Sequence, residues 1–204
     1  NKETKIKIEI GDPKICFRYT GIVIKNIKVT ESPNWLKSKL ESIGVKSINN
    51  IVDITNFILH DLGQPLHAFD LNEITNKIIK ARTAKSNTLF TTLDDNERKL
   101  DENDLMICNE SEEMCIAGVF GGKNSGVKES TTDIFIESAL FDPVSIRKTA
   151  KNLNIETDAK YRFERGVDPS SIEDGLKIAA DLIINICGGE ASKFNFAGKK
   201  TFKK

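Results

Sequence analysis

Alternating polar and apolar residues open the chain and predict β-strands. Isoleucine alternates with lysine or glutamate over residues 5–10, which indicates an edge strand with one face in water. After a Gly-Asp-Pro turn, residues 17–29 alternate again and are rich in isoleucine, valine, tyrosine and threonine. Because β-branched and aromatic residues favour strands, this run predicts one long strand or two strands with a kink.

Two helices are predicted next, from apolar residues that recur at helical spacing. Ser32, followed by a proline, is typical of a helix start, and the glycine at position 44 is typical of its end. Ser47 begins the second helix, whose apolar stripe reaches residue 62 before another glycine stops it.

Short strands and turns fill the middle of the chain. Residues 63–70 fit neither the strand period nor the helix period, so no element is assigned to them. Residues 118–126 are predicted to form a glycine-rich loop. Short strands are predicted at residues 78–81, 88–93 and 98–100 (the last two as a hairpin), 105–108, 114–117 and 134–138.

Three helices are predicted in the last third of the chain. Asp142 stands before a proline and caps a helix through about residue 153. Asp168 also precedes a proline and opens a long helix that ends at a pair of glycines. Between these two helices, either Thr157 or Asp158 caps a short one.

The order of the elements predicts an α+β fold, because strands outnumber helices and do not alternate strictly with them. We expect mixed or antiparallel sheets with about four to five helices packed on them, as two interlocked subdomains. The 204 residues suffice for one such module, 1–204, with a soft internal boundary near residues 70–77. The chain does not begin with methionine, which suggests a fragment of a longer chain.

The composition is typical of a soluble globular protein, with 39% hydrophobic and 29% charged residues. Thirty basic residues balance thirty acidic ones, so a dedicated nucleic-acid binder is disfavoured and RNA contact requires a local patch. Four cysteines without a Cys-x-x-Cys pair, and only two histidines, provide no metal site at a recognised spacing. Reduced thiols and the lack of a visible signal peptide or membrane span favour a cytoplasmic location.

Two segments outside the predicted elements carry residues suited to chemistry. His67 comes shortly after Pro65, which fixes the local backbone, and an imidazole acts as base, acid or donor near neutral pH. The alternative is a histidine that satisfies a buried polar position. In the glycine-rich loop, Lys123 and the backbone amides are suited to an anion, the alternative being a long tight turn. The loop has neither the Walker spacing nor a clean dinucleotide fingerprint.

A carboxylate stands inside the apolar run at residues 134–141. Glu137 shares its strand face with Phe135 and Ala139, so we expect it to point inward. There it requires a hydrogen-bond donor, because burying an unpaired charge is costly. The alternative is the outer face of an edge strand. The arginines and acidic residues at 156–168 are interpreted as structural bracing.

Six segments, in this order, resemble the central region of the beta subunit of bacterial phenylalanyl-tRNA synthetase. The resemblance covers about residues 18–190, and several motifs agree in order and spacing. The segments are Asp53-Ile54-Thr55-Asn56, Gly63-Gln64-Pro65-Leu66-His67-Ala68-Phe69-Asp70, Ala117-Gly118-Val119-Phe120-Gly121-Gly122 with Ser125-Gly126-Val127, Glu137-Ser138-Ala139, Thr157-Asp158-Ala159, and Arg162-Phe163-Glu164-Arg165-Gly166-Val167-Asp168.

In that family this region, the B3/B4-type editing module, hydrolyses tyrosine that is wrongly attached to tRNA(Phe). The resemblance implies that Glu137 receives the tyrosine hydroxyl and that His67 lies near the scissile ester. It implies His67 and Thr157 as catalytic residues. The substrate-binding residues that it implies are Glu137, Pro65, Ala117, Gly118, Gly121 and Ala159.

The implied chemistry is hydrolysis of an aminoacyl ester with water as the nucleophile and without a metal. A site that must hydrogen-bond one hydroxyl rejects the analogue lacking it by about 10⁴–10⁵ at best. We expect His67 to orient the water or the terminal ribose, with a tRNA hydroxyl as a second candidate base. The backbone amides of residues 118–122 are expected to stabilise the oxyanion.

The resemblance also implies cofactors and partners. ATP and Mg²⁺ serve the parent enzyme, whose adenylate-forming site lies on the alpha subunit, and no cofactor is expected in this region. The implied partners are the acceptor end of tRNA(Phe) carrying a tyrosyl ester and the alpha subunit of the parent heterotetramer, with neither DNA nor a membrane. Two alternatives stay open: a scaffold that cradles tRNA without editing, and an unrelated small-molecule binding domain of the same fold.

Overall fold

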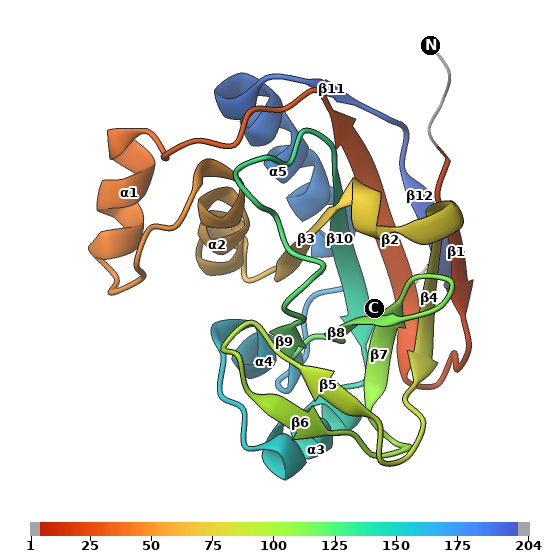
Figure 1. Ribbon diagram of the computed structural model, residues 1–204. Coiled ribbons are helices and arrows are strands. Elements are labelled where there is room, and N and C mark those ends of the chain that lie inside the picture. Colours follow the sequence, from red (N-terminus) through yellow and green to blue (C-terminus); the bar gives the residue numbers. More distant parts are fainter. Residues whose placement is uncertain (1–4, 200–204) are drawn as a thin grey trace.

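Three β-sheets form the frame of the molecule in the computed structural model, which describes residues 5–199 (Figure 1). The first, here called the mixed sheet, has the order β1-β4-β7-β8-β9, in which β1 and β4 are parallel and the other pairs antiparallel. Its strands are β1 (Lys7–Ile10), β4 (Ile78–Thr83), β7 (Leu105–Cys108), β8 (Glu113–Ile116) and β9 (Phe120–Gly121).

The second sheet, here called the central sheet, is antiparallel throughout. It has the order β11-β2-β10-β3, and β12 also pairs with β2. Its strands are β11 (Glu190–Ala191), β2 (Cys16–Lys25), β10 (Ile134–Phe141), β3 (Leu66–Asp70) and β12 (Asn195–Gly198). A small hairpin of β5 (Leu89–Thr91) and β6 (Glu97–Lys99) completes the β structure of the described residues.

In the part of the chain that the structure describes, five α-helices and two short 3-10 turns lie around these sheets, which confirms the predicted α+β class. The helices are α1 (Asn34–Glu41), α2 (Asn50–Leu62), α3 (Pro143–Leu153), α4 (Asp158–Phe163) and α5 (Ser171–Cys187), and the turns are Leu71–Glu73 and Thr75–Lys77. Within residues 5–199, no helix has the length and apolar character that a membrane crossing requires.

The central sheet separates two hydrophobic cores, and this explains why every residue of β10 is buried. Ile134 and Ile136 pack with α2 and α5 on one face, whereas Phe135 and Ala139 pack with the mixed sheet on the other. Because side chains alternate along a strand, Glu137 lies on the face of Phe135 and Ala139. The prediction that Glu137 points inward is confirmed, since its exposed fraction is 5%.

Several of the predicted strands and helices are confirmed. Residues 16–25 form one strand rather than two. Asp142 caps α3 by accepting from the amide of Ser145, and Thr157 caps α4 by accepting from the amide of Lys160. The long helix predicted from Asp168 is α5, which begins three residues later and buries its apolar face.

Two predicted helix starts are wrong for a common reason. Neither Ser32 nor Ser47 caps a helix; both hydroxyls donate to Oδ2 of Asp53, which is fully buried in α2. The N-cap of α1 is Pro33, without a side-chain hydrogen bond, and α2 is capped by Asn49. The two serines bind a carboxylate that only the folded chain brings to them.

The segment left without an element, residues 63–70, contains the strand β3. Its alternation is hidden in the sequence because both faces of this strand are covered. Ala68 packs toward α2 and α5, while Phe69 packs toward the mixed sheet. A strand that is buried on both faces lacks the polar-apolar alternation of a half-exposed strand.

Candidate functional site

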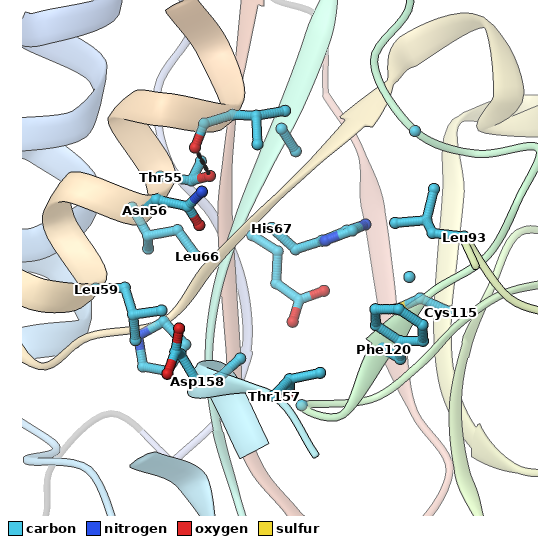
Figure 2. A pocket seen from close by; sticks show the side chains of 18 of the residues that line it. Thr55, Asn56, Leu59, Leu66, His67, Leu93, Cys115, Phe120, Thr157 and Asp158 are labelled. Carbon is cyan, nitrogen blue, oxygen red and sulfur yellow. Dashed lines mark hydrogen bonds between the residues drawn. The ribbon is translucent and has the colours of Figure 1, made fainter. Parts of the chain in front are cut away.

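A cavity of about 570 Å³ lies where α2, β3, β8, β10, the glycine-rich loop and α4 meet. Figure 2 shows Thr55, Asn56 and Leu59 of α2 facing it from one side, and Leu93 and Phe120 from the other. A volume of this size is typical of small-molecule sites in proteins.

Glu137 is the buried carboxylate of this cavity. Its Oε2 accepts a hydrogen bond of 2.6 Å from the hydroxyl of Tyr19. Burial raises the pKa of Glu137 to about 7, although the bond from Tyr19 acts in the opposite direction. Among the described residues, Oε1 of Glu137 makes no hydrogen bond.

His67 is the neighbour of Glu137 on the adjacent strand, because the two residues pair directly between β3 and β10. Its ring packs edge to face against Phe69, with centroids 4.4 Å apart, and extends into the cavity (Figure 2). Burial lowers the pKa of His67 to about 4, so the imidazole is neutral at pH 7. Its Nε2 is buried without a hydrogen-bond partner among residues 5–199. The alternative that His67 satisfies a buried polar position therefore does not hold for this atom.

The glycine-rich loop approaches His67 closely, and Gly121 is the point of contact. A Cβ at Gly121 would lie 3.1 Å from Cε1 of His67 and 2.7 Å from Cδ1 of Leu93. Any larger residue would therefore displace the imidazole or fill the cavity. Gly118 has a φ of 66°, a conformation that favours glycine.

Two amides of this loop are already bonded within the protein, which removes them from the predicted oxyanion site at residues 118–122. The amide of Val119 donates to the carbonyl of Ile116, and the amide of Gly122 donates to the carbonyl of Met114. Neither amide is available to an oxyanion. Lys123, the candidate anion ligand, pairs with Asp95 and does not line this cavity.

Thr157 connects α4 to the glycine-rich loop. Its hydroxyl accepts from the amide of Lys160 at 3.1 Å and donates to the carbonyl of Val119 at 2.8 Å. Its only proton is thereby used within the protein. These bonds place the first turn of α4, with Asp158 and Ala159, at the cavity wall.

The structure brings seven of the eight predicted site residues to this one cavity. They are Pro65, His67, Gly118, Gly121, Glu137, Thr157 and Ala159. The exception is Ala117, which is 1% exposed and belongs to the hydrophobic core behind the cavity. Ala117 does not line the cavity.

Tyr19 is the residue of this site that the sequence did not reveal. It is fully buried in β2 and is separated from Glu137 by 118 positions. A buried tyrosine hydroxyl usually has a hydrogen-bond partner, and this rule was the only signal in the sequence. It did not identify the partner.

Among the described residues, the cysteines and acidic residues near the site form neither a thiolate nucleophile nor a cluster of metal ligands. All four cysteines are buried and free. Burial raises the pKa of Cys115, which lines the cavity, well above the ordinary value of a thiol, so it is not a thiolate at neutral pH. In the described part of the chain, no group of three or more His, Cys, Asp or Glu residues is placed to hold a metal.

A comparison with protein families decides the identity of the module. The model of the B3/4 domain family matches residues 15–188. The chain belongs to the B3/4 domain family. The cavity therefore lies inside the matched region, and the resemblance drawn from the motifs is confirmed.

Relatives of this B3/4 domain are phenylalanine–tRNA ligase beta subunits. The beta subunit of Porphyromonas gingivalis is 52% identical over 188 residues, which are 92% of this chain and 23% of that protein. The beta subunit of Bacteroides fragilis is 50% identical over 192 residues, which are 94% of this chain and 23% of that protein. The chain thus spans about a quarter of the length of these relatives.

A solved structure has the same fold. An N-terminal fragment of the phenylalanyl-tRNA synthetase beta subunit from Pyrococcus horikoshii has a TM-score of 0.62 and covers 94% of this chain, which covers 51% of that one. The two sequences are 12% identical, so this likeness shows the fold alone.

Proposed function

We propose that this B3/4 domain is an editing site that hydrolyses the ester of tyrosine wrongly attached to tRNA(Phe). One observation carries the proposal. The carboxylate of Glu137 is buried at the cavity, with Oε2 held by Tyr19 and Oε1 free of hydrogen bonds among the described residues. Such an oxygen, open to the cavity that Glu137 lines, is free to accept a hydrogen bond from a donor on the ligand.

The hydroxyl of a tyrosyl group supplies this donor, and a phenylalanyl group does not. Tyrosine in the cavity satisfies Oε1 of Glu137. Phenylalanine leaves a buried carboxylate without its donor, at a cost of about 1–3 kcal/mol or more. The cavity therefore selects the error and rejects the correct product.

Hydrolysis follows if the ester lies beside His67. A water molecule attacks the ester carbonyl and the bond to the ribose oxygen breaks. The ribose oxygen takes one proton of the water, and tyrosine leaves as its carboxylate while the other proton passes to solvent. With a pKa of about 4, His67 is a weak base at pH 7, so we assign it the role of orienting the water rather than of removing its proton. Thr157 holds α4 and the glycine-rich loop around the substrate.

The parent enzyme in this proposal is phenylalanine–tRNA ligase, located in the cytoplasm. Its alpha subunit and tRNA(Phe) are the proposed partners, and ATP with Mg²⁺ serves its ligase reaction rather than this cavity. This assignment is supported by the relatives named above, which are phenylalanine–tRNA ligase beta subunits 50–52% identical to this chain.

The test uses the parent enzyme and tRNA(Phe) charged beforehand with tyrosine, without ATP. We expect Glu137→Ala to slow deacylation at least about tenfold, because a hydrogen bond to a charged group contributes about 1.5–3 kcal/mol. Ala159→Trp fills the cavity and has the same effect, while charging with phenylalanine persists in both variants. Glu9→Ala is the matched control, since Glu9 lies on β1 at the edge of the mixed sheet.

Failure of the wild type to release tyrosine would favour the scaffold alternative. Equal deacylation by the wild type and the Glu137→Ala enzyme would show that Glu137 does not sense the hydroxyl.

A further inference from the structure

Tyr19 and Glu137 are joined by the register of the two central strands. Glu137 pairs with Gly21 and Ala139 pairs with Tyr19 between β10 and β2. Tyr19 and Glu137 are therefore diagonal neighbours on one face of the sheet, a spacing that an aromatic side chain spans. A shift of one residue would turn one of them to the other face.

The hydroxyl of Tyr19 has Glu137 as its single hydrogen-bond partner among the described residues. Tyr19 is fully buried, and its hydroxyl makes no other hydrogen bond within residues 5–199. The hydroxyl donates to Oε2 and leaves Oε1 of the same carboxylate for another donor. One oxygen is thus anchored, and rotation of the carboxylate would break the anchor.

Among residues 5–199, no positive charge is placed to compensate the carboxylate of Glu137. The titratable groups that face it are Tyr19 and Cys16 on β2, Cys115 on β8 and His67 on β3. All four are neutral at pH 7, because burial raises the pKa of the tyrosine and the thiols and lowers that of the imidazole. Tyr19 is the group that offsets the effect of burial on Glu137.

We propose that Tyr19 is a positioning residue for specificity: it anchors Oε2 of Glu137 and presents Oε1 to the hydroxyl of the substrate. This inference rests on the proposed editing function. Tyr19 acts through Glu137 and does not contact the substrate itself, since it does not line the cavity.

The chain provides a matched pair of variants, because Tyr19 and Tyr161 are its two tyrosines. Tyr161 is 48% exposed and lies on α4 away from the cavity lining. In the parent enzyme, we expect Tyr19→Phe to lower kcat/KM for tyrosyl-tRNA(Phe) about tenfold or more at pH 7. The rate should recover at higher pH, where Glu137 is ionised without help, and Tyr161→Phe should leave it unchanged.

A double variant separates positioning from a general structural effect. If Tyr19 acts through Glu137, then Tyr19→Phe causes no further loss in a Glu137→Gln enzyme. An additional tenfold loss in that background would overturn the inference. The inference would also be overturned if Tyr19→Phe kept the wild-type rate while Glu137→Gln was slow. That outcome would not affect the proposed editing function. An inactive wild type would overturn both proposals.

The pKa of Glu137 in the 204-residue chain gives a readout that does not depend on catalysis. The carboxyl carbon of Glu137 is followed by NMR as the pH is changed. We expect the pKa to rise above about 7 in Tyr19→Phe and to stay unchanged in Tyr161→Phe.

A second substitution covers the case in which Tyr19→Phe does not fold. Incorporation of 3-fluorotyrosine into the Tyr161→Phe chain labels Tyr19 alone and makes its hydroxyl a stronger donor. The pKa of Glu137 should then fall. An unchanged pKa in both Tyr19→Phe and the fluorinated chain would overturn the inference.

Discussion

At the scale of single residues, burial displaces the pKa values of Glu137 and His67 in opposite directions. The pKa of Glu137 rises from 4.5 to about 7, and that of His67 falls from 6.5 to about 4. Both shifts favour the uncharged form, because a charge in this apolar wall loses its hydration. Perturbed groups that share a cavity are typical of functional sites.

These shifts predict a pH dependence of stability. Glu137 stabilises the fold below pH 4.5, and this contribution is lost as the pH rises through about 7. His67 contributes stability above pH 6.5 that is lost as the pH falls through about 4. The two contributions therefore offset each other between about pH 4.5 and 6.5.

The variant Glu137→Gln separates these contributions. Between pH 4.5 and 8, we expect the free energy of unfolding of the wild type to decrease by about 3 kcal/mol relative to the variant. Urea unfolding at several pH values measures the difference. Parallel curves for the two proteins would contradict the assignment of the titration to Glu137.

At the scale of elements, small residues and buried polar groups fix how the strands and helices meet. Asp53 in α2 binds the hydroxyls of Ser32 and Ser47 and the amide of Ile48, so it holds the segments before α1 and before α2 against that helix. In β2, Gly21 lies opposite Glu137 and beneath the ring of Phe135. These contacts set the cavity wall indirectly.

Gly21→Ala is expected to destabilise the central sheet. A Cβ at this position would lie 2.0 Å from Cζ of Phe135, and the packed core gives that ring little room to move. We expect a loss of about 1–3 kcal/mol or more in the free energy of unfolding, measured by chemical denaturation. Gly126→Ala is the control, because its Cβ would come no closer than 3.8 Å to another group. Equal losses in the two variants would show that Phe135 yields easily.

At the scale of the whole molecule, the central sheet contributes side chains to two hydrophobic cores, one on each of its faces. The helices α2 and α5 cover one face of β2 and β10, and the mixed sheet covers the other (Figure 1). The predicted soft boundary near residues 70–77 lies where the chain passes from β3 to β4, from one sheet to the next. Because both cores need the central sheet, we expect them to unfold together.

Leu176→Ala tests this cooperativity. Leu176 is fully buried in α5 on the helix side, and its truncation should cost about 2–5 kcal/mol. In hydrogen exchange, we expect the amides of β7, on the opposite side of the central sheet, to lose the same protection. Ile178→Ala on the exposed face of the same helix should change nothing. Unaltered protection of β7 in Leu176→Ala would indicate two subdomains that unfold separately.

The sequence by itself determined the features that depend on neighbours along the chain. The caps of α3 and α4, the buried face of α5 and the inward direction of Glu137 follow from short-range rules of capping and periodicity. The ordered motifs indicated the family. Seven of the eight predicted site residues line the cavity.

Only the tertiary structure decided the features that depend on partners far along the chain. β3 escaped prediction because its two faces are covered by different cores. Ser32 and Ser47, predicted as helix caps, instead donate hydrogen bonds to Asp53. Ala117, predicted at the cavity, lies in the hydrophobic core. The bond from Tyr19 to Glu137 depends on the register of two strands, and a register is set by packing across the sheet, which no local pattern contains.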